Sequence, residues 1–406
     1  MLTPYDALEI RSADARAADL ARALPAQISR AADLTGYREA LAGIDPAAIK
    51  TPADLARLPV LRKADLGAAQ MKWPPLGGFA TLAPGEFRHL FQSPGPIYEP
   101  GNHSHDWWRV GRFLHACGIG AGDIVQNCFS YHLTPAGMIF ESGARAVGAA
   151  VIPAGTGQTE AQVQAAAHLG ATAYAGTPDY LKVILDKADA MGVALGITRA
   201  AVGGGALFPA LRQAYGDRGI ACLQNYATAD LGNIAYESDA AEGLIVDEGV
   251  VVEIVTPGTG DPVPDGEVGE VVVTTLNPDY PLIRLATGDL SAILPGQSPC
   301  GRTNSRIKGW MGRADQTTKV KGMFVRPEQV ADLVARHDEI ARARVVVERN
   351  GNQDAMTVRL ETDTQDATIY EQTVLDTLKL RGKVELVRLG DLPRDGLVIE
   401  DLRRYD

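Results

Sequence analysis

The stretch from Pro281 to Val330 reads PLIRLATGDLSAILPGQSPCGRTNSRIKGWMGRADQTTKVKGMFVRPEQV, and it decides the fold class predicted for the chain. It begins with an apolar Pro-Leu-Ile-Arg, typical of a buried strand end, followed by a predicted turn that ends in Asp289. Arg313 comes later, before a polar junction. A carboxylate accepts hydrogen bonds from vicinal hydroxyls, and a guanidinium donates them to oxygens. We therefore predict that Asp289 and Arg313 form a clamp for a ribose or another diol.

The order of these motifs, PLIRxxTGDL followed by GRxDxxxKVxG, resembles that of the adenylate-forming (AMP-binding) superfamily. The branch it is most similar to is phenylacetate-CoA ligase. The resemblance implies an α/β fold with a large N-terminal domain of doubly wound sheets plus a small β subdomain, over residues 1–313. It also implies a small α+β lid domain over residues 314–406 that rotates about a hinge near Asp315 and Gln316. Relatives of this branch often pair as homodimers.

The residue patterns outside the motifs agree with this architecture. At 406 residues the chain is too long for one ordinary core, so two unequal domains or three subdomains are expected. Strand and helix patterns alternate over residues 106–169, as in a doubly wound sheet. Two apolar runs within residues 243–275, joined by Pro, Gly and Asp, predict a hairpin. The last 80 or so residues give helix, strand, Asn-Gly turn, strand, helix and strand, in the order of a compact lid.

The amino-acid composition limits which binding partners and which cellular location are expected. Apolar residues make up 46% of the chain, and the net charge of -11 argues against binding to nucleic acid or to an anionic membrane surface. The N-terminal residues carry no apolar run of signal-peptide length, and no segment approaches the roughly 20 apolar residues of a membrane span. These features predict a cytoplasmic protein. Four cysteines lie far apart, so we expect reduced thiols and no zinc.

The resemblance also implies binding residues for AMP or ATP and for coenzyme A. Gly204 and Gly205 follow an apolar strand, where glycines let a flat base approach the backbone; a tight turn alone is the alternative. Tyr226 offers a face for adenine. Lys319 and Lys321 are expected near the thiol channel.

Two further positions are implied as catalytic residues. Asp230 stands where the family has a magnesium-binding glutamate; it keeps a hard oxygen ligand but is one methylene shorter, so magnesium binding is compatible with the sequence rather than indicated by it. His132 borders the implied acyl pocket for a small carboxylic acid or acyl-CoA, although a lone histidine near a strand end is more often structural. Lys63 matches a family lysine, and a plain helix start explains it equally well.

Three features of the family that handle triphosphate are absent. The segment from 86 to 101, EFRHLFQSPGPIYEPG, stands in place of a phosphate loop, yet its prolines lack amide hydrogens and Glu99 would repel phosphate. Ala229 replaces a phosphate-contacting threonine. Leu397 replaces the lid lysine, with Arg403 or Arg404 as the remaining candidates for its charge. Losing one such electrostatic stabiliser costs on the order of a hundred- to a thousandfold in rate.

Three functions are therefore considered. The first is an acid-CoA ligase of the phenylacetate-CoA ligase type, which forms an acyl-adenylate and then a thioester. The second is an enzyme on the same scaffold that acts on an acyl thioester or related acyl compound without ATP. The third is a non-catalytic binder of a nucleotide or acyl-CoA. Family resemblance favours the first, and the three losses favour the other two.

Overall fold

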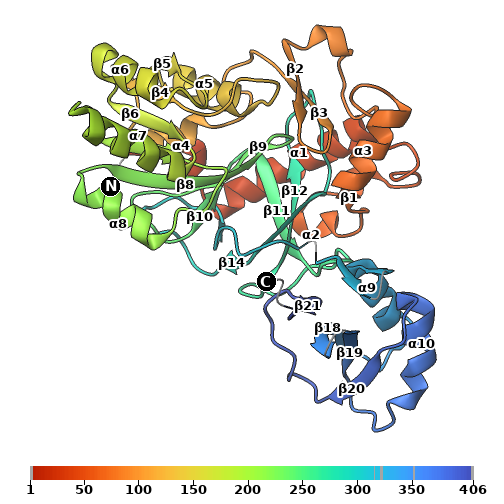
Figure 1. The fold of residues 1–406 in the computed structure, drawn as a ribbon. Coiled ribbons are helices and arrows are strands. Elements are labelled where there is room, and N and C mark those ends of the chain that lie inside the picture. Colours follow the sequence, from red (N-terminus) through yellow and green to blue (C-terminus); the bar gives the residue numbers. More distant parts are fainter. Residues whose placement is uncertain (1–2, 315, 321–322, 351–352, 404–406) are drawn as a thin grey trace. The chain divides into compact units, whose positions relative to one another are not determined.

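The computed structural model describes residues 3–314, 316–320, 323–350 and 353–403 (Figure 1). These residues form two compact units. Unit 1 comprises the residues up to Val252, Val273–Thr287 and Leu294–Trp310. Unit 2 comprises Glu253–Val272, Gly288–Ile293 and the residues from Met311 on. The domain boundary expected between residues 313 and 314 stays a prediction.

A nine-stranded sheet organises unit 1. Its order is β14-β15-β10-β9-β8-β7-β6-β4-β5. Strands β4 to β8 run parallel, and each is joined to the next by one helix of the series α5 to α8, so the predicted alternation of strand and helix is confirmed. The strands are β4 (Ile124–Asn127), β5 (Ala150–Pro153), β6 (Ala173–Gly176), β7 (Arg199–Val202), β8 (Ala221–Thr228), β9 (Gly232–Tyr236), β10 (Leu244–Val246), β14 (Ile293–Leu294) and β15 (Arg306–Ile307).

The helices that alternate with the parallel strands lie beside this sheet, and further helices form the N-terminal part of unit 1 (Figure 1). They begin at residues that favour helix starts, with Ser12 capping α1 and prolines in the first turn of α2, α7 and α8. The helices are α1 (Ala13–Ala32), α2 (Pro52–Leu55), α3 (Lys63–Lys72), α4 (Gly111–Ala116), α5 (Ala136–Ala146), α6 (Thr159–Leu169), α7 (Pro178–Met191) and α8 (Pro209–Asp217), with 3-10 turns η1 (Ala7–Ile10), η2 (Pro46–Ala48) and η3 (Pro84–Glu86).

A four-stranded sheet has the order β1-β13-β12-β11. Its strands are β1 (Leu61–Arg62), β11 (Val250–Val255), β12 (Gly269–Thr275) and β13 (Leu285–Ser291). The two apolar runs of residues 243–275 are neighbours in this sheet, as predicted. The turn predicted over Thr287–Asp289 is wrong, because these residues lie inside β13. Gly288 has a positive φ of 75°, so the glycine kinks a strand instead of ending it.

Unit 2 contains another four-stranded sheet, with the order β20-β19-β18-β21, and helices α9 and α10 lie against it (Figure 1). Apolar residues recur every three or four positions in α9 and α10 and every second position in β18 and β19; they meet in one core. The predicted order of elements is confirmed, and β21 adds a short strand that the pattern did not indicate. The elements are β16 (Thr318–Val320), β17 (Met323–Val325), α9 (Pro327–Ala335), β18 (Arg342–Asn350), β19 (Gln353–Glu361), α10 (Thr368–Leu378), β20 (Lys383–Val387) and β21 (Ile399–Asp401).

Among the described residues, none of the helices is both long enough and apolar enough to cross a bilayer.

Candidate functional site

One group of predicted site residues gathers at an edge of the large sheet in unit 1. The loops after β4, β7 and β8 all leave the carboxyl ends of parallel strands, where ligands bind in open α/β sheets. Gly204 and Gly205 lie exposed after β7, and Tyr226 lies half-buried near the end of β8. His132 lies exposed in the loop after β4, where its backbone N–H donates to Ser130 Oγ at 3.2 Å. The fold therefore places these residues at one edge of the sheet, and their ligand roles stay predictions.

The turn after β7 requires its glycines. A Cβ on Gly203 would lie 2.2 Å from Asn225 Oδ1, and Gly204 has a φ of +69°. The Asn225 side chain is held by its own donation to Asn233 Oδ1 at 2.9 Å. The backbone of this turn therefore approaches β8 more closely than a residue with a Cβ would permit.

The segment in the place of a phosphate loop forms a β-hairpin. Strands β2 (His89–Ser93) and β3 (Ile97–Gly101) pair antiparallel, with Phe91 opposite Glu99. The pairing commits part of the backbone of each strand to the other, and Pro94 and Pro96 in the connecting turn have no amide hydrogen. The poor triphosphate cradle expected from the sequence stays a prediction.

Helix α3 fixes the hairpin beside Lys63. Lys63 is the first residue of α3, directly after β1. Two turns later the Gln70 side chain clamps the Tyr98 backbone, donating to its carbonyl at 2.7 Å and accepting from its N–H at 2.9 Å. Tyr98 precedes Glu99, so one short helix positions both the lysine and the glutamate. Lys63 is a helix start, as the alternative explanation held, and it also reaches a charged partner.

That partner is Asp230. The Lys63 ammonium lies 2.9 Å from Asp230 Oδ2, and the Asp230 side chain is only 1% exposed whereas that of Lys63 is 42% exposed. Buried carboxylates need a counter-charge because desolvation penalises the ionised form. The lysine supplies it, so Asp230 faces a protein cation. The role of Asp230 as a magnesium ligand stays a prediction.

Glu99 lies in the segment that replaces the phosphate loop, and no sequence pattern indicated that its side chain is buried. Its carboxyl is 1% exposed, and Oε2 has no hydrogen-bond partner within the described part of the chain. Burial, reinforced by the negative charge of Asp230, raises the pKa of Glu99 to about 8, although hydrogen bonds from Ser93 and the charge of Lys63 oppose this. A carboxylic acid with such a pKa holds a proton near neutral pH.

Tyr280 was missed by sequence reasoning altogether. It is buried, and its pKa is raised by that burial and further by the charges of Asp230 and Glu99. It directly precedes the Pro-Leu-Ile-Arg motif, which offered the only signal for it. Lys63, Glu99, Asp230 and Tyr280 thus form one electrostatically coupled group, the acid cluster.

Asp289 and Arg313 are brought together within unit 2. Arg313 Nη1 donates to Asp289 Oδ1 at 2.9 Å, and the two residues also form an isolated antiparallel β-bridge. The flanking backbone continues this pairing, because Leu290 N–H donates to Gly312 and Ala314 N–H donates to Gly288. The aspartate side chain is 13% exposed and that of the arginine 55%, so solvent reaches the guanidinium. The predicted proximity is found, and diol binding stays a prediction.

Gly288 makes this approach possible. An added Cβ would lie 2.7 Å from Arg313 Nη2, and the φ of +75° is itself strained for other residues. The glycine therefore lets the arginine lie flat against β13.

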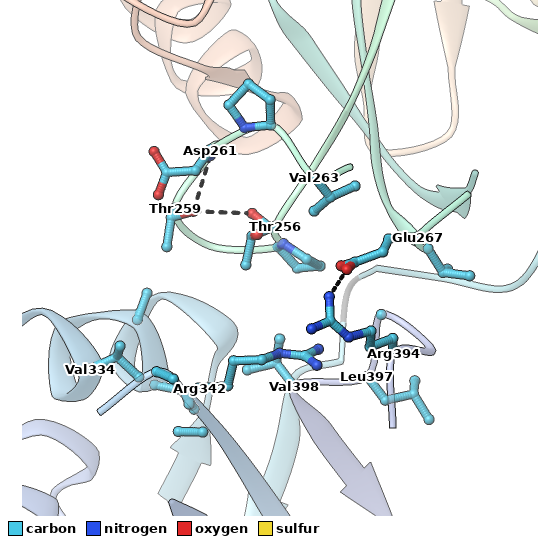
Figure 2. A pocket seen from close by; sticks show the side chains of 18 of the residues that line it. Thr256, Thr259, Asp261, Val263, Glu267, Val334, Arg342, Arg394, Leu397 and Val398 are labelled. Atoms are coloured by element: carbon cyan, nitrogen blue, oxygen red, sulfur yellow. Dashed lines mark hydrogen bonds and ion pairs between the residues drawn. The ribbon is translucent and has the colours of Figure 1, made fainter. Parts of the chain in front are cut away.

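The loop from 392 to 397, which ends at the position of the missing lysine, is anchored by Gln316. The Gln316 side chain donates to the Gly396 carbonyl at 2.8 Å and accepts from Ile399 N–H at 2.8 Å. Leu397 lines a cavity of about 320 Å³ within unit 2, together with Arg342 and Val398 (Figure 2). Arg394, on the same loop, forms an ion pair with Glu267. Leu397 thus contributes apolar surface where a lysine would have contributed charge.

Arg403 does not offer a free charge in place of that lysine. Its side chain is 5% exposed and forms ion pairs with Asp401 at 2.6 Å and Asp354 at 3.0 Å. The arginine lowers the pKa of Asp401 to about 2. Arg404, Lys321 and the expected hinge residue Asp315 lie outside the described residues. Lys319 lies in β16, and its side chain is not among those described.

The described residues contain neither a group of metal ligands nor a disulfide. Across the described ranges, no three histidine, cysteine or carboxylate side chains are grouped to hold a metal ion. The four cysteines are free thiols, and Cys117, Cys128 and Cys222 are buried.

Comparisons with known proteins place the chain among coenzyme A ligases. It is 31% identical over 344 residues to phenylacetate-coenzyme A ligase of Aromatoleum evansii, covering 80% of this chain and 76% of that protein. It is 30% identical, with the same coverage, to phenylacetate-coenzyme A ligase of Thermus thermophilus. No family model matches the chain.

Among solved structures, the open conformation of 2-hydroxyisobutyryl-CoA ligase in complex with 2-HIB-AMP and CoA superposes with a TM-score of 0.72. It shares 23% identity and covers 97% of this chain and 94% of that one. The likeness shows that the two chains share a fold.

Proposed function

Because this chain belongs to the phenylacetate-coenzyme A ligase family, we propose that it makes an acyl-coenzyme A thioester by way of an acyl-adenylate. The observation that carries the proposal is the contact between Asp289 and Arg313 at 2.9 Å, which leaves the guanidinium open to solvent. Such a pair can receive the two ribose hydroxyls of an adenylate, with the carboxylate accepting and the guanidinium donating. The related 2-hydroxyisobutyryl-CoA ligase was solved with an acyl-AMP and CoA, which is consistent with this ligand class.

The thioester step balances without further reagents. The thiol sulfur of coenzyme A attacks the acyl carbon, a carbon–sulfur bond forms, and the carbon–oxygen bond to the phosphate breaks. AMP leaves, and the thiol proton passes to solvent. The acyl donor is a small carboxylic acid activated as its adenylate, and the partner is coenzyme A. Homodimer formation and a cytoplasmic location remain predictions from the sequence.

The proposed roles of the site residues follow the sequence predictions. Tyr226 stacks on adenine, and Gly204 and Gly205 leave room for the ring. Asp289 and Arg313 hold the ribose. His132 borders the acyl group, Lys319 and Lys321 serve coenzyme A, and Asp230 faces the phosphate end.

A second function is favoured by the burial of Glu99. A hairpin that carries a buried acid in the place of a phosphate loop suits a scaffold that transforms a ready-made acyl compound without ATP. The same assay decides between the two. The protein is mixed with coenzyme A and given either an aryl or alkyl acid with ATP and magnesium or the corresponding preformed acyl-adenylate, and thioester and pyrophosphate are quantified chromatographically.

We expect thioester from the adenylate at a rate at least about a hundredfold above that from ATP and acid, since three stabilisers of triphosphate chemistry are absent. Comparable rates would show a complete ligase. Turnover of an acyl-CoA without any adenylate would support the second function. Binding of AMP or acyl-CoA without turnover would contradict both and indicate a binding protein.

A further inference from the structure

We propose that Lys63 is the built-in cation of Asp230, taking the place that a magnesium ion would otherwise take on this carboxylate. The protein then handles the single negative charge of an adenylate phosphate without a divalent ion. This inference rests on the proposed function, because the ligand is the acyl-adenylate or AMP.

The first observation is the contact itself. Lys63 Nζ lies 2.9 Å from Asp230 Oδ2, and the aspartate is enclosed while the lysine reaches it from the solvent side. A magnesium ion binds carboxylate oxygens at about 2.1 Å and keeps several waters. An ammonium that already touches the oxygen from the open side occupies the space where the ion and its waters would enter. Neither Asp230 oxygen has a hydrogen-bond partner in the described part of the chain, so the Lys63 ammonium is the contact that offsets the charge of this carboxylate.

The second observation is that Lys63 is held in place by rigid elements. It is the first residue of α3, and the preceding residue Arg62 donates its backbone N–H to Asp65 Oδ2 at 3.2 Å. Strand β1, which leads into α3, pairs parallel with β13 at Leu61 and Leu285. The base of the lysine side chain is therefore fixed on the sheet. Displacing the ammonium would leave a buried aspartate without its counter-charge, which is strongly unfavourable.

The third observation concerns Glu99, the other carboxyl of the acid cluster. Its side chain is enclosed by the hairpin and α3, with Oε2 unpartnered among the residues that the structure describes. Near neutral pH Glu99 holds its proton, so the positive charge of Lys63 and the negative charge of Asp230 cancel. No surplus positive charge remains for a triphosphate, which carries about four negative charges near neutral pH. The phosphate of an acyl-adenylate carries one, so the acid cluster disfavours it less than it disfavours a triphosphate.

Manganese binding tests the proposal without relying on activity. Mn²⁺ replaces Mg²⁺ at oxygen sites, and its electron paramagnetic resonance signal falls when it binds. Wild-type protein, Lys63→Ala, Asp230→Asn and Lys63→Ala/Asp230→Asn are titrated with Mn²⁺ in the presence of AMP. Lys72→Ala is the matched control, because Lys72 is at the far end of the same helix and lies over the Trp73 ring.

We expect wild type and Lys72→Ala to leave Mn²⁺ free. Lys63→Ala should bind it at least about tenfold more tightly, since Asp230 then lacks a cation, and the double variant should lose that gain. Mn²⁺ bound by wild type and released by Asp230→Asn would overturn the proposal. This arm needs no destabilised variant, so it decides even if Lys63→Ala fails to fold.

A second readout separates this inference from the proposed function. Thioester formation from a preformed acyl-adenylate is measured with and without EDTA. An unchanged rate supports the assignment of Lys63, and a rate that EDTA abolishes and Mg²⁺ restores overturns it. If no thioester forms under either condition while Mn²⁺ stays free, the proposed function fails and the assignment of Lys63 is supported.

Discussion

Asp289 and Arg313, which are 24 residues apart, meet as backbone bridge partners and as side-chain ion-pair partners at 2.9 Å. The backbone bridge fixes where each side chain begins, so the ion pair is preorganised. Since Arg313 is more than half exposed, the pair contributes little to stability, on the order of 0–1 kcal/mol. The pair therefore adds little to folding, and the role proposed for it is to bind the ribose.

Asp289→Ala is expected to weaken AMP binding by about ten- to a hundredfold, because a charged acceptor for the ribose hydroxyls is lost. The melting temperature should change little, since the pair is partly exposed. Isothermal titration calorimetry with AMP measures the effect. The control is Asp332→Ala, which removes an exposed helix ion pair to Arg336 at 2.8 Å in the same unit. Equal AMP affinity in wild type and Asp289→Ala would contradict the assigned role.

Gly288→Ala should displace the Arg313 guanidinium, because the new Cβ would lie 2.7 Å from Nη2. A further destabilisation of about 1–2 kcal/mol is expected from the φ of +75°. Gly296→Ala is a matched control, because Gly296 has a φ of +80° and nothing within 4 Å of an added Cβ. Both variants should lose similar stability, and only Gly288→Ala should lose AMP affinity. Loss of affinity in both would refute a specific effect on Arg313.

Glu99 predicts a defined pH dependence of stability. Its pKa is about 8 in the folded protein, against 4.5 for an unperturbed glutamate, so the folded state holds an extra proton between these pH values. The free energy of unfolding should therefore fall as pH rises from about 4.5 to about 8 and then level off. Each unit of pKa difference corresponds to about 1.4 kcal/mol, so the contribution is a few kcal/mol at most.

Urea denaturation at several pH values checks this dependence. Glu99→Gln should flatten that part of the profile and be more stable than wild type at pH 8 and above. Glu39→Gln, at an exposed residue, should leave the profile unchanged. A wild-type profile that rises between pH 5 and 8, with no change on Glu99→Gln, would show that Glu99 is not buried as an acid.

Leu397→Lys restores the residue that the family has at the end of the lid. We expect less than about a tenfold gain in ATP-dependent pyrophosphate release, because the β2–β3 hairpin and Ala229 still fail to hold a triphosphate. A coupled pyrophosphate assay measures it. The new lysine would also lie in the cavity that Leu397 lines. A gain of about a hundredfold or more would mean that the lysine alone was missing.

The parts of the fold with local signals could be predicted from the sequence. The lid order followed from periodicity, as with Val345 and Val347 alternating in β18 and Val330 and Leu333 on one face of α9. The proximity of Asp289 and Arg313 was expected from the order of the motifs that carries the family resemblance. The three-residue strand β21 was too short to leave a pattern, and it exists because it pairs with β18.

The acid cluster could not be predicted because its members are far apart in the chain. Lys63, Glu99, Asp230 and Tyr280 come from a helix start, a hairpin and two loops, and no local pattern relates them. Their contact depends on the packing of α3 on the hairpin through Gln70. The sequence showed that Glu99 is wrong for a phosphate loop. The structure adds that Glu99 is buried beside the pair of Lys63 and Asp230. This burial raises its pKa to about 8.

The central claim is that the protein holds a nucleoside through Asp289 and Arg313 and does not favour a triphosphate. Calorimetric titration of wild-type protein and Asp289→Ala with AMP and with Mg·ATP tests it most directly. The account predicts that wild type binds AMP at least about tenfold more tightly than Mg·ATP and that Asp289→Ala loses the AMP affinity. Tighter binding of Mg·ATP than of AMP, or AMP affinity that survives in Asp289→Ala, would contradict it.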